Sequence, residues 1–153
     1  MRIPYILFTS SGLEKIKKEK EELLLRRPTA VENLRIAREM GDLSENGAYK
    51  AARAELSSLD SRLRHLNYLL CVGRVQTAPI VKGRIGIGSK VKLSDGKKEM
   101  EYEIVGSFES DPSQGRISHI SPLGKSLMGK GQGENVTMQT PDSVVNYKVL
   151  QIL

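Results

Sequence analysis

The sequence has no tryptophan, only two phenylalanines and one cysteine. With so few large aromatic side chains and 27% charged residues, a bulky globular core is not expected, and much of the 153-residue chain should be exposed surface. The single Cys71 excludes an internal disulfide, and we expect it to be buried in a structural role. The apolar run at residues 3–8 is too short for a signal peptide or a membrane span, so a cytoplasmic location is expected.

Positive charge is in excess, with a formal net charge of +6 and a sequence pI of about 9.5. This balance favours an acidic partner such as nucleic acid. No block of like charge is long enough to form a disordered nucleic-acid-binding tail. The run "KIKKEKEE" at residues 15–22 mixes both signs, which is typical of a solvated helix face.

The first half of the sequence predicts two long helices, of which the first covers residues 12–40. This stretch is dense in Leu, Glu, Lys and Arg, the strong helix formers, and it follows Thr9 and Ser10, two residue types that cap helices. Pro28 lacks a backbone donor, so we expect a kink or a brief break in the turn before it. Apolar residues recur at steps of three and four, although basic residues interrupt the series: Leu13, Ile16, Leu23, Ala30, Leu34 and Ala37.

The second helical pattern alternates steps of three and four without a miss, through Tyr49, Ala52, Leu56, Leu59, Leu63, Leu66 and Leu70. All seven positions lie along one stripe, which needs a partner helix. Only a few residues connect the two patterns, and short connections produce antiparallel neighbours. The sequence therefore predicts an antiparallel coiled-coil hairpin on the order of 40 to 45 Å long, with its tip at residues 41–46.

From about Val75 the sequence changes to Gly, Pro, Val and Ile with period-2 stretches, which predicts strands. A hairpin turn is expected at Asp95 and Gly96, and Ser121 before Pro122 predicts the start of a short helix. The expected strands cover residues 89–95, 101–107, 116–121, 134–140 and 146–153. The predicted fold class is α+β, with a helical hairpin at residues 1–78 and a small antiparallel sheet packed on one helix at residues 79–153.

Two carboxylates, Asp42 and Glu45, are three residues apart at the predicted tip. This spacing fits a capping box that satisfies the first amides of the second helix, and spacing alone favours that interpretation. It also fits magnesium, which prefers oxygen ligands and often takes one or two carboxylates. An isolated tip would hold the ion only weakly, so in this interpretation the carboxylates are donated to a site elsewhere that already holds phosphate and another metal.

Basic residues flank the tip on both sides: Arg35, Arg38, Lys50 and Arg53. They suit contact with a phosphate backbone or, as for Arg35 with Glu39, ion pairing along one helix. Tyr49 begins the apolar stripe, so packing against the first helix is favoured over stacking on a base. His65 and His119 have no candidate ligands beside them in sequence and are expected to be solvated or satisfied residues, not metal ligands.

Motifs along essentially the whole chain resemble those of the bacterial Gre family of transcript-cleavage factors. They are "RRP" at residues 26–28, "AREMGDLSENGAYKAAR" at 37–53, "EYEIVG" at 101–106 and "ISHISPLGKSLMGK" at 117–130. The tip motif followed by the Ser-Pro segment at this distance is highly specific. The resemblance implies that the N-terminal hairpin enters the secondary channel of RNA polymerase, while a C-terminal domain similar in fold to the FK506-binding proteins (FKBP-like) docks near the channel entrance.

Members of this family reactivate backtracked complexes by stimulating the polymerase to hydrolyse its own transcript near the extruded 3′ end. By this resemblance, Asp42 and Glu45 match the acidic tip residues that help to hold magnesium and to position the attacking water. The ion is then expected only in the polymerase complex, and not bound stably by this chain alone. The chain is expected to be no enzyme itself, since it supplies carboxylates in trans.

The resemblance also assigns partners. Arg38 and Arg53 match basic positions implicated in contact with the 3′ end of the nascent RNA. Ser121 and Pro122 match the part of the C-terminal domain associated with polymerase docking. A monomer that binds bacterial RNA polymerase and no membrane is expected.

Gly47 and Ala48 depart from the family pattern, in which many relatives have alanine and then glutamate. One negative charge near the tip is therefore missing. Gly47 costs about 1 kcal/mol of helix stability relative to alanine.

Three functions compete. The first is a cleavage stimulator that supplies Asp42 and Glu45, and the presence of both acids favours it. The second is a regulator that occludes the channel and inhibits transcription without stimulating cleavage. The third is a prolyl isomerase or chaperone, which has little support because fold does not fix function and residues 79–153 offer only Tyr102, Phe108 and Tyr147 for an apolar proline pocket.

Overall fold

The fold is described here from a computed structural model, over residues 5–41, 46–76 and 81–153. The chain forms two compact units, one of Leu13–Val72 and one that combines Met1–Gly12 with Gly73–Leu153. The second unit thus takes in residues on the N-terminal side of the predicted boundary at 78. Among them, residues 6–8 pair with residues 73–75.

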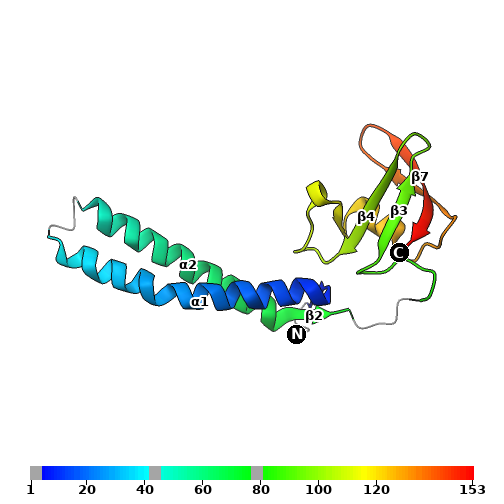
Figure 1. Cartoon of the computed structure of the whole chain (residues 1–153). Coiled ribbons are helices and arrows are strands. Elements are labelled where there is room, and N and C mark those ends of the chain that lie inside the picture. The colour runs from blue at the N-terminus through cyan, green and yellow to red at the C-terminus, as the bar shows by residue number, and fades with distance from the viewer. Residues whose placement is uncertain (1–4, 42–45, 77–80) are drawn as a thin grey trace. The chain divides into compact units, whose positions relative to one another are not determined.

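The helical unit is a hairpin of two helices, α1 (Ser10–Glu39) and α2 (Gly47–Val72), which lie side by side in Figure 1. Thr9 caps α1, since its hydroxyl accepts a hydrogen bond from the Gly12 amide at 3.0 Å. The predicted antiparallel hairpin is confirmed.

The seam between the helices follows the predicted stripes. Ala30 packs with Leu59 and Leu63 in one cluster, and Leu34 and Ala37 pack with Ala52 in a second cluster nearer the tip. Each fully buried leucine contributes about 1.5–3 kcal/mol. The small residues in both clusters allow the two backbones to approach closely.

Helix α1 runs through Pro28 without a break, so of the predicted kink or brief break the break is absent. Proline removes one backbone hydrogen bond, but contacts on either side hold the helix in register. Leu23 packs with the cluster of Ala30, and the Arg27 guanidinium Nε lies 2.7 Å from the Asp60 carboxylate of α2.

The second unit is built on a five-stranded sheet of order β5-β4-β3-β7-β6. Its strands are β3 (Lys90–Ser94), β4 (Glu99–Val105), β5 (Arg116–Ser118), β6 (Asn135–Gln139) and β7 (Val144–Ile152). The pairs β3–β4, β3–β7 and β6–β7 are antiparallel, as predicted. Strands β4 and β5 run parallel, so the prediction of an antiparallel sheet was wrong for this pair. Parallel strands need a longer connection than a hairpin turn. Residues 106–115, which include a 3-10 turn at Pro112–Gln114, provide it between β4 and β5.

The core of this unit is aliphatic. One cluster contains Ile85, Val91, Leu93, Ile104, Ile117, Leu127, Val136 and Val149, with Tyr102 and Tyr147 packed against it. Helix α3 (Pro122–Leu127) contributes Leu127 and begins at the predicted Ser121–Pro122 signature. Gly124 of α3 must be glycine, because a Cβ there would lie 2.0 Å from the Ser118 carbonyl oxygen.

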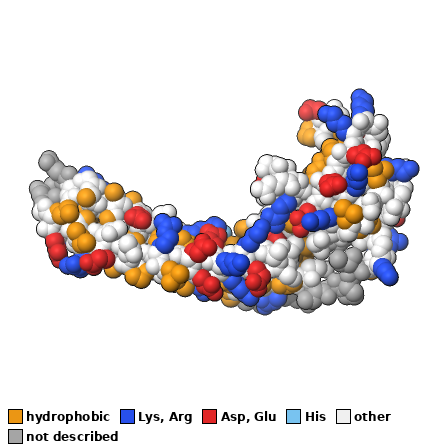
Figure 2. All heavy atoms as spheres, viewed as in Figure 1, with side chains coloured by type: hydrophobic (Ala, Val, Ile, Leu, Met, Phe, Trp, Pro, Cys, Tyr) orange, Lys and Arg blue, Asp and Glu red, His pale blue; other side chains and the backbone are white. Residues whose placement is uncertain are grey.

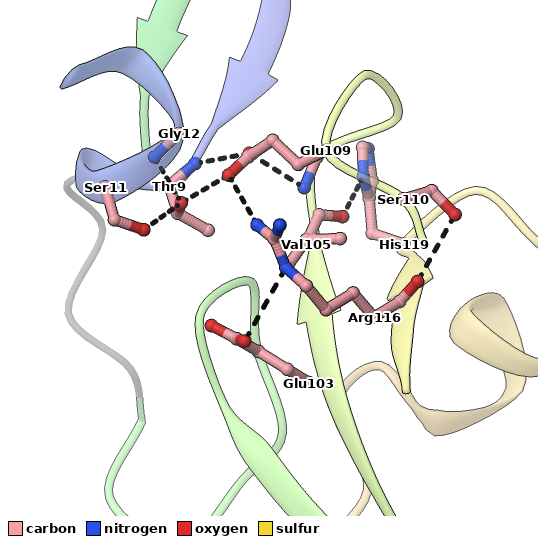
Figure 3. Close-up of polar contacts among 10 residues, drawn as sticks. Thr9, Ser11, Gly12, Glu103, Val105, Glu109, Ser110, Arg116 and His119 are labelled. Atoms are coloured by element: carbon pink, nitrogen blue, oxygen red, sulfur yellow. Dashed lines mark hydrogen bonds and ion pairs between the residues drawn. The ribbon is translucent and has the colours of Figure 1, made fainter. Parts of the chain in front are cut away.

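A two-stranded parallel ribbon of β1 (Ile6–Phe8) and β2 (Gly73–Val75) completes the second unit. The Phe8 ring lies 6.3 Å from that of Phe108, centroid to centroid. Glu109, next to Phe108, bonds to the residue that follows Phe8. Its carboxylate accepts hydrogen bonds from the Thr9 amide at 2.8 Å, the Thr9 hydroxyl at 2.5 Å and the Gly106 amide at 3.2 Å (Figure 3). Arg116 Nη2 lies 3.6 Å from the same carboxylate. This Glu109 cluster ties Thr9 to residues 106–116 within the second unit.

Cys71 is exposed on α2, so its predicted burial was wrong. It lies between Leu70 and Val72, outside the buried stripe. No helix within the described ranges is both long and apolar enough to cross a membrane.

Candidate functional site

The candidate site is the tip of the hairpin, where α1 ends and α2 begins. Helix α1 stops at Glu39, and Gly41 has φ +118°, a left-handed conformation that glycine adopts most readily. Asp42 and Glu45, the predicted acidic pair, lie outside the described residues. Among the residues that are described, no group of three acidic, His or Cys side chains is placed to hold a metal ion.

Asn46 caps helix α2. Its side-chain oxygen accepts a hydrogen bond from the Tyr49 amide at 3.0 Å, which is the N3 position of a helix that begins at Gly47. The capping interpretation of Asp42 and Glu45 falls on residues outside the described ranges. Among the described residues, Asn46 provides the cap of α2.

The same side chain also reaches the other helix. Asn46 Nδ2 donates a hydrogen bond to the Ala37 carbonyl at 2.8 Å. The last carbonyls of a helix have no partner within it, so this bond satisfies one of the orphan acceptors of α1. One amide group thus links the two helix ends that flank residues 42–45.

The basic residues around the tip divide into two kinds. Arg35 is fully engaged on its own helix, with Glu39 at 2.6 Å and Glu32 at 2.7 Å. The Glu32 carboxylate raises the pKa of Arg35, and the guanidinium in turn lowers the pKa of Glu32. The ion-pairing interpretation of Arg35 is confirmed.

Arg38, Lys50 and Arg53 are exposed, and none of them forms an ion pair with another residue that the structure describes. The Arg38 guanidinium lies over the Tyr49 ring, 5.9 Å from its centroid. Tyr49 itself packs with Leu34, Ala37 and Ala52, as predicted. The exposed charges at the tip are therefore held near the seam without being neutralised by described acids.

Ser121 and Pro122, the predicted docking residues, lie at the start of α3. The Ser121 hydroxyl donates to the Ser118 carbonyl at 2.7 Å and accepts from the Gly124 amide at 3.0 Å, so it serves as a cap. Pro122 is exposed, and so is the neighbouring Ile120. Two exposed apolar residues thus flank the capping serine in the sequence.

Neither histidine belongs to a metal-ligand cluster among the described residues. His119 Nδ1 lies 3.2 Å from the Val105 carbonyl, which satisfies this nitrogen as expected. His65 is exposed on α2 and lies near Glu19, whose pKa it helps to lower.

Two features escaped prediction from the sequence. Asparagine before a run of helix formers is a common helix cap, so the sequence does carry a signal for Asn46. The sequence interpretation assigned the cap to the neighbouring acids instead. Glu109 carries no such signal, because its partners are a hundred residues away at Thr9 and seven away at Arg116.

Two family models match the chain, "Transcription elongation factor, N-terminal" at residues 6–75 and "Transcription elongation factor, GreA/GreB, C-term" at residues 80–153. The chain belongs to the GreA/GreB family. A GreA/GreB relative from a Nitratiruptor species, named transcription elongation factor GreA, is 42% identical over 147 residues that cover 94% of this chain and 90% of its own. A relative of the same name from Thermodesulfovibrio yellowstonii is 37% identical, over 99% of this chain and 96% of its own.

Solved structures of GreA/GreB proteins also match. The crystal structure of GreA factor homolog 1 (Gfh1) of Thermus thermophilus is 25% identical, covers 97% of this chain and 99% of its own, and has a TM-score of 0.46.

Proposed function

We propose that the protein is a transcription elongation factor that binds bacterial RNA polymerase and stimulates cleavage of the 3′ RNA in backtracked, arrested complexes, which then resume elongation. The observation that carries this proposal is the family match, which spans both halves of the chain and includes the acidic tip. Relatives that cover nine-tenths or more of the chain bear the name transcription elongation factor GreA.

The route to the active site is the secondary channel of the polymerase, which the helical hairpin enters tip first. Two features support it. Ala37 and Ala52 keep the helices close together near the tip. The exposed surface of the helical unit carries both signs of charge, interspersed along its length (Figure 2). The apolar seam of each helix is covered by the other helix of the same chain, so a monomer suffices.

The chemistry belongs to the polymerase, and this chain contributes Asp42 and Glu45. Two carboxylates have the right donor chemistry for magnesium, but the ion needs about six oxygen ligands, so they complete a shell that polymerase, RNA and water begin. Magnesium in such a two-metal site supplies an activated water and stabilises the leaving oxygen. The factor is therefore not itself an enzyme, and holds the ion only within the complex.

The extruded RNA is held by Arg38 and Arg53. Both side chains are exposed and free of described acidic partners, so they are available to phosphate oxygens. Arg35 is excluded from this role because two carboxylates on its own helix already hold it.

Docking to the polymerase uses the start of α3, where Pro122 and Ile120 are exposed beside the Ser121 cap. An apolar contact anchored by an ordered turn suits a specific protein interface. A prolyl isomerase is disfavoured, because Tyr102 and Tyr147 pack against the core of the sheet unit and Phe108 stacks with Phe8.

The test is 3′-transcript cleavage by halted, backtracked polymerase complexes in magnesium, with wild type compared with the Asp42→Asn, Glu45→Gln double variant at matched occupancy. The control is Glu55→Gln with Asp142→Asn, which removes the same charge from two exposed positions away from the tip. Loss of cleavage in the tip variant alone supports the proposal. Binding by wild type without any stimulation would instead identify a regulator that blocks the channel.

A further inference from the structure

We infer that Asn46 is a positioning residue for the acidic pair, acting by tying the end of α1 to the start of α2. The inference rests on the proposed function, since it matters only if Asp42 and Glu45 take part in cleavage. It assigns Asn46 no contact with RNA, metal or polymerase.

The two bonds of Asn46 use opposite ends of one amide. Its oxygen accepts from the Tyr49 amide at 3.0 Å, and its nitrogen donates to the Ala37 carbonyl at 2.8 Å. The partners fix the orientation of the amide, because a backbone N–H can only donate and a carbonyl can only accept. The side chain is half-buried, so water competes only partly for these groups.

This hydrogen bond lies beside the segment that carries the acidic pair. The segment that carries both carboxylates begins after Gly41 and ends at Asn46. The carbonyl that Asn46 holds belongs to Ala37, in the last turn of α1. This bond therefore holds Asn46, which follows the segment, against the last turn of α1, which precedes it.

No other polar contact between described residues does this at the tip. The remaining side-chain bridges between the helices, Arg27–Asp60 and Arg62–Glu19, join residues more than ten positions away from the tip along α2. The Arg38–Tyr49 contact crosses the helices near the tip, but Arg38 is proposed to leave it for RNA. Apolar packing of Ala37 with Ala52 holds the helices together without fixing their axial register as a directed bond does.

Different substitutions separate the two roles of Asn46. Asn46→Ser keeps a good cap for the Tyr49 amide, is neutral, and is too short to reach Ala37. Asn46→Asp also keeps the cap but has no donor for the Ala37 carbonyl. Asn67→Ser, at an exposed position of α2, is the matched control.

Each variant is titrated into backtracked polymerase complexes, which gives a maximal cleavage rate and the factor concentration at half-maximum. We expect both Asn46 variants to lower the maximal rate by roughly tenfold or more, because small misplacements of catalytic groups are costly. The half-maximal concentration and the thermal midpoint should stay at the wild-type values, as should both quantities in the control. By NMR, the Tyr49 amide should remain protected from exchange in Asn46→Ser, since its cap is retained.

Two results would overturn the inference. In the first, both variants cleave at the wild-type maximal rate. In the second, rate, midpoint and half-maximal concentration all worsen together, which would show that Asn46 only supports folding. The Asp42→Asn, Glu45→Gln variant is assayed alongside: if it cleaves normally the proposed function itself fails, whereas its loss of cleavage with normal Asn46 variants removes only the present inference.

Discussion

At the scale of single residues, the most constrained side chain outside the tip is Glu109. It is nearly fully buried, yet it is satisfied by three hydrogen bonds and by Arg116, so its burial does not leave a lone charge. Gly12 and Gly106 leave room for it, because a Cβ on either would lie within 3 Å of its carboxylate. A buried acid of this kind stabilises one packing of two distant segments of the same unit, here Thr9 and the turn at Gly106.

We predict that Glu109→Ala lowers the free energy of unfolding of the sheet unit by about 1–3 kcal/mol, because it leaves the Thr9 and Gly106 amides without their acceptor. Urea unfolding followed by circular dichroism measures this. Glu101→Ala, at an exposed position of β4, is the control and should stay close to wild type. Equal losses in both variants would show that the cluster contributes little.

At Gly47 we predict that a substitution raises the free energy of unfolding. A Cβ built on it meets nothing within 4 Å, and its φ is not positive, so alanine fits. Gly47→Ala should raise the stability of the helical unit by up to about 1 kcal/mol through helix propensity. Thermal unfolding measured by circular dichroism at 222 nm should show a higher midpoint, and a lower one would mean that the start of α2 needs glycine for another reason.

At the scale of elements, the hairpin is joined by an apolar seam and by two cross-helix ion pairs, Arg27–Asp60 and Arg62–Glu19. The hydrogen bond from Arg62 lowers the pKa of Glu19, and that from Arg27 lowers the pKa of Asp60. Since folding lowers both pKa values, the unfolded chain binds more protons in acid, and stability must rise with pH across this range.

The stabilisation from these pairs should be complete above the ordinary carboxyl pKa values of 4.5 and 3.8, and should be lost as the pH falls further through the lowered values. Thermal midpoints of the hairpin signal between pH 2.5 and 6 test this. Glu19→Gln with Asp60→Asn should flatten the acid side of the curve. Both pairs are largely exposed, so the effect should be small and should shrink in high salt. An unchanged curve in the double variant would assign the acid sensitivity to other groups.

Periodicity predicted the elements well where one side-chain pattern decides the structure. The stripe from Ala52 to Leu66 and the Ser121–Pro122 helix start are examples. Periodicity failed where a contact between residues far apart in the sequence decides the structure. Pro28 was expected to kink or briefly break α1, but the helix is unbroken there, and Leu23 and Ala30 on either side pack with leucines of α2. The parallel pairing of β5 with β4 depends on the path of residues 106–115, which has no periodic signature.

At the scale of the whole molecule, two separately built units share one chain, and the positions proposed for function fall in both. The tip carboxylates and the arginines proposed to contact RNA belong to the hairpin, whereas Ser121 and Pro122, proposed for docking, belong to the sheet unit. The family and both of its motif-bearing regions could be predicted from the sequence, because they lie in continuous stretches. From the sequence alone, Asn46 could not be told from the acids beside it as the cap of α2, since asparagine and aspartate cap helices equally well.

The most direct test of the central claim is the rate at which backtracked RNA polymerase complexes cleave their 3′ RNA at saturating factor. The account predicts strong stimulation by wild type and by the Glu55→Gln, Asp142→Asn control. It predicts a loss of about 10²-fold or more in Asp42→Asn, Glu45→Gln at unchanged binding. Stimulation that survives removal of both acids would contradict the assignment of chemistry to the tip.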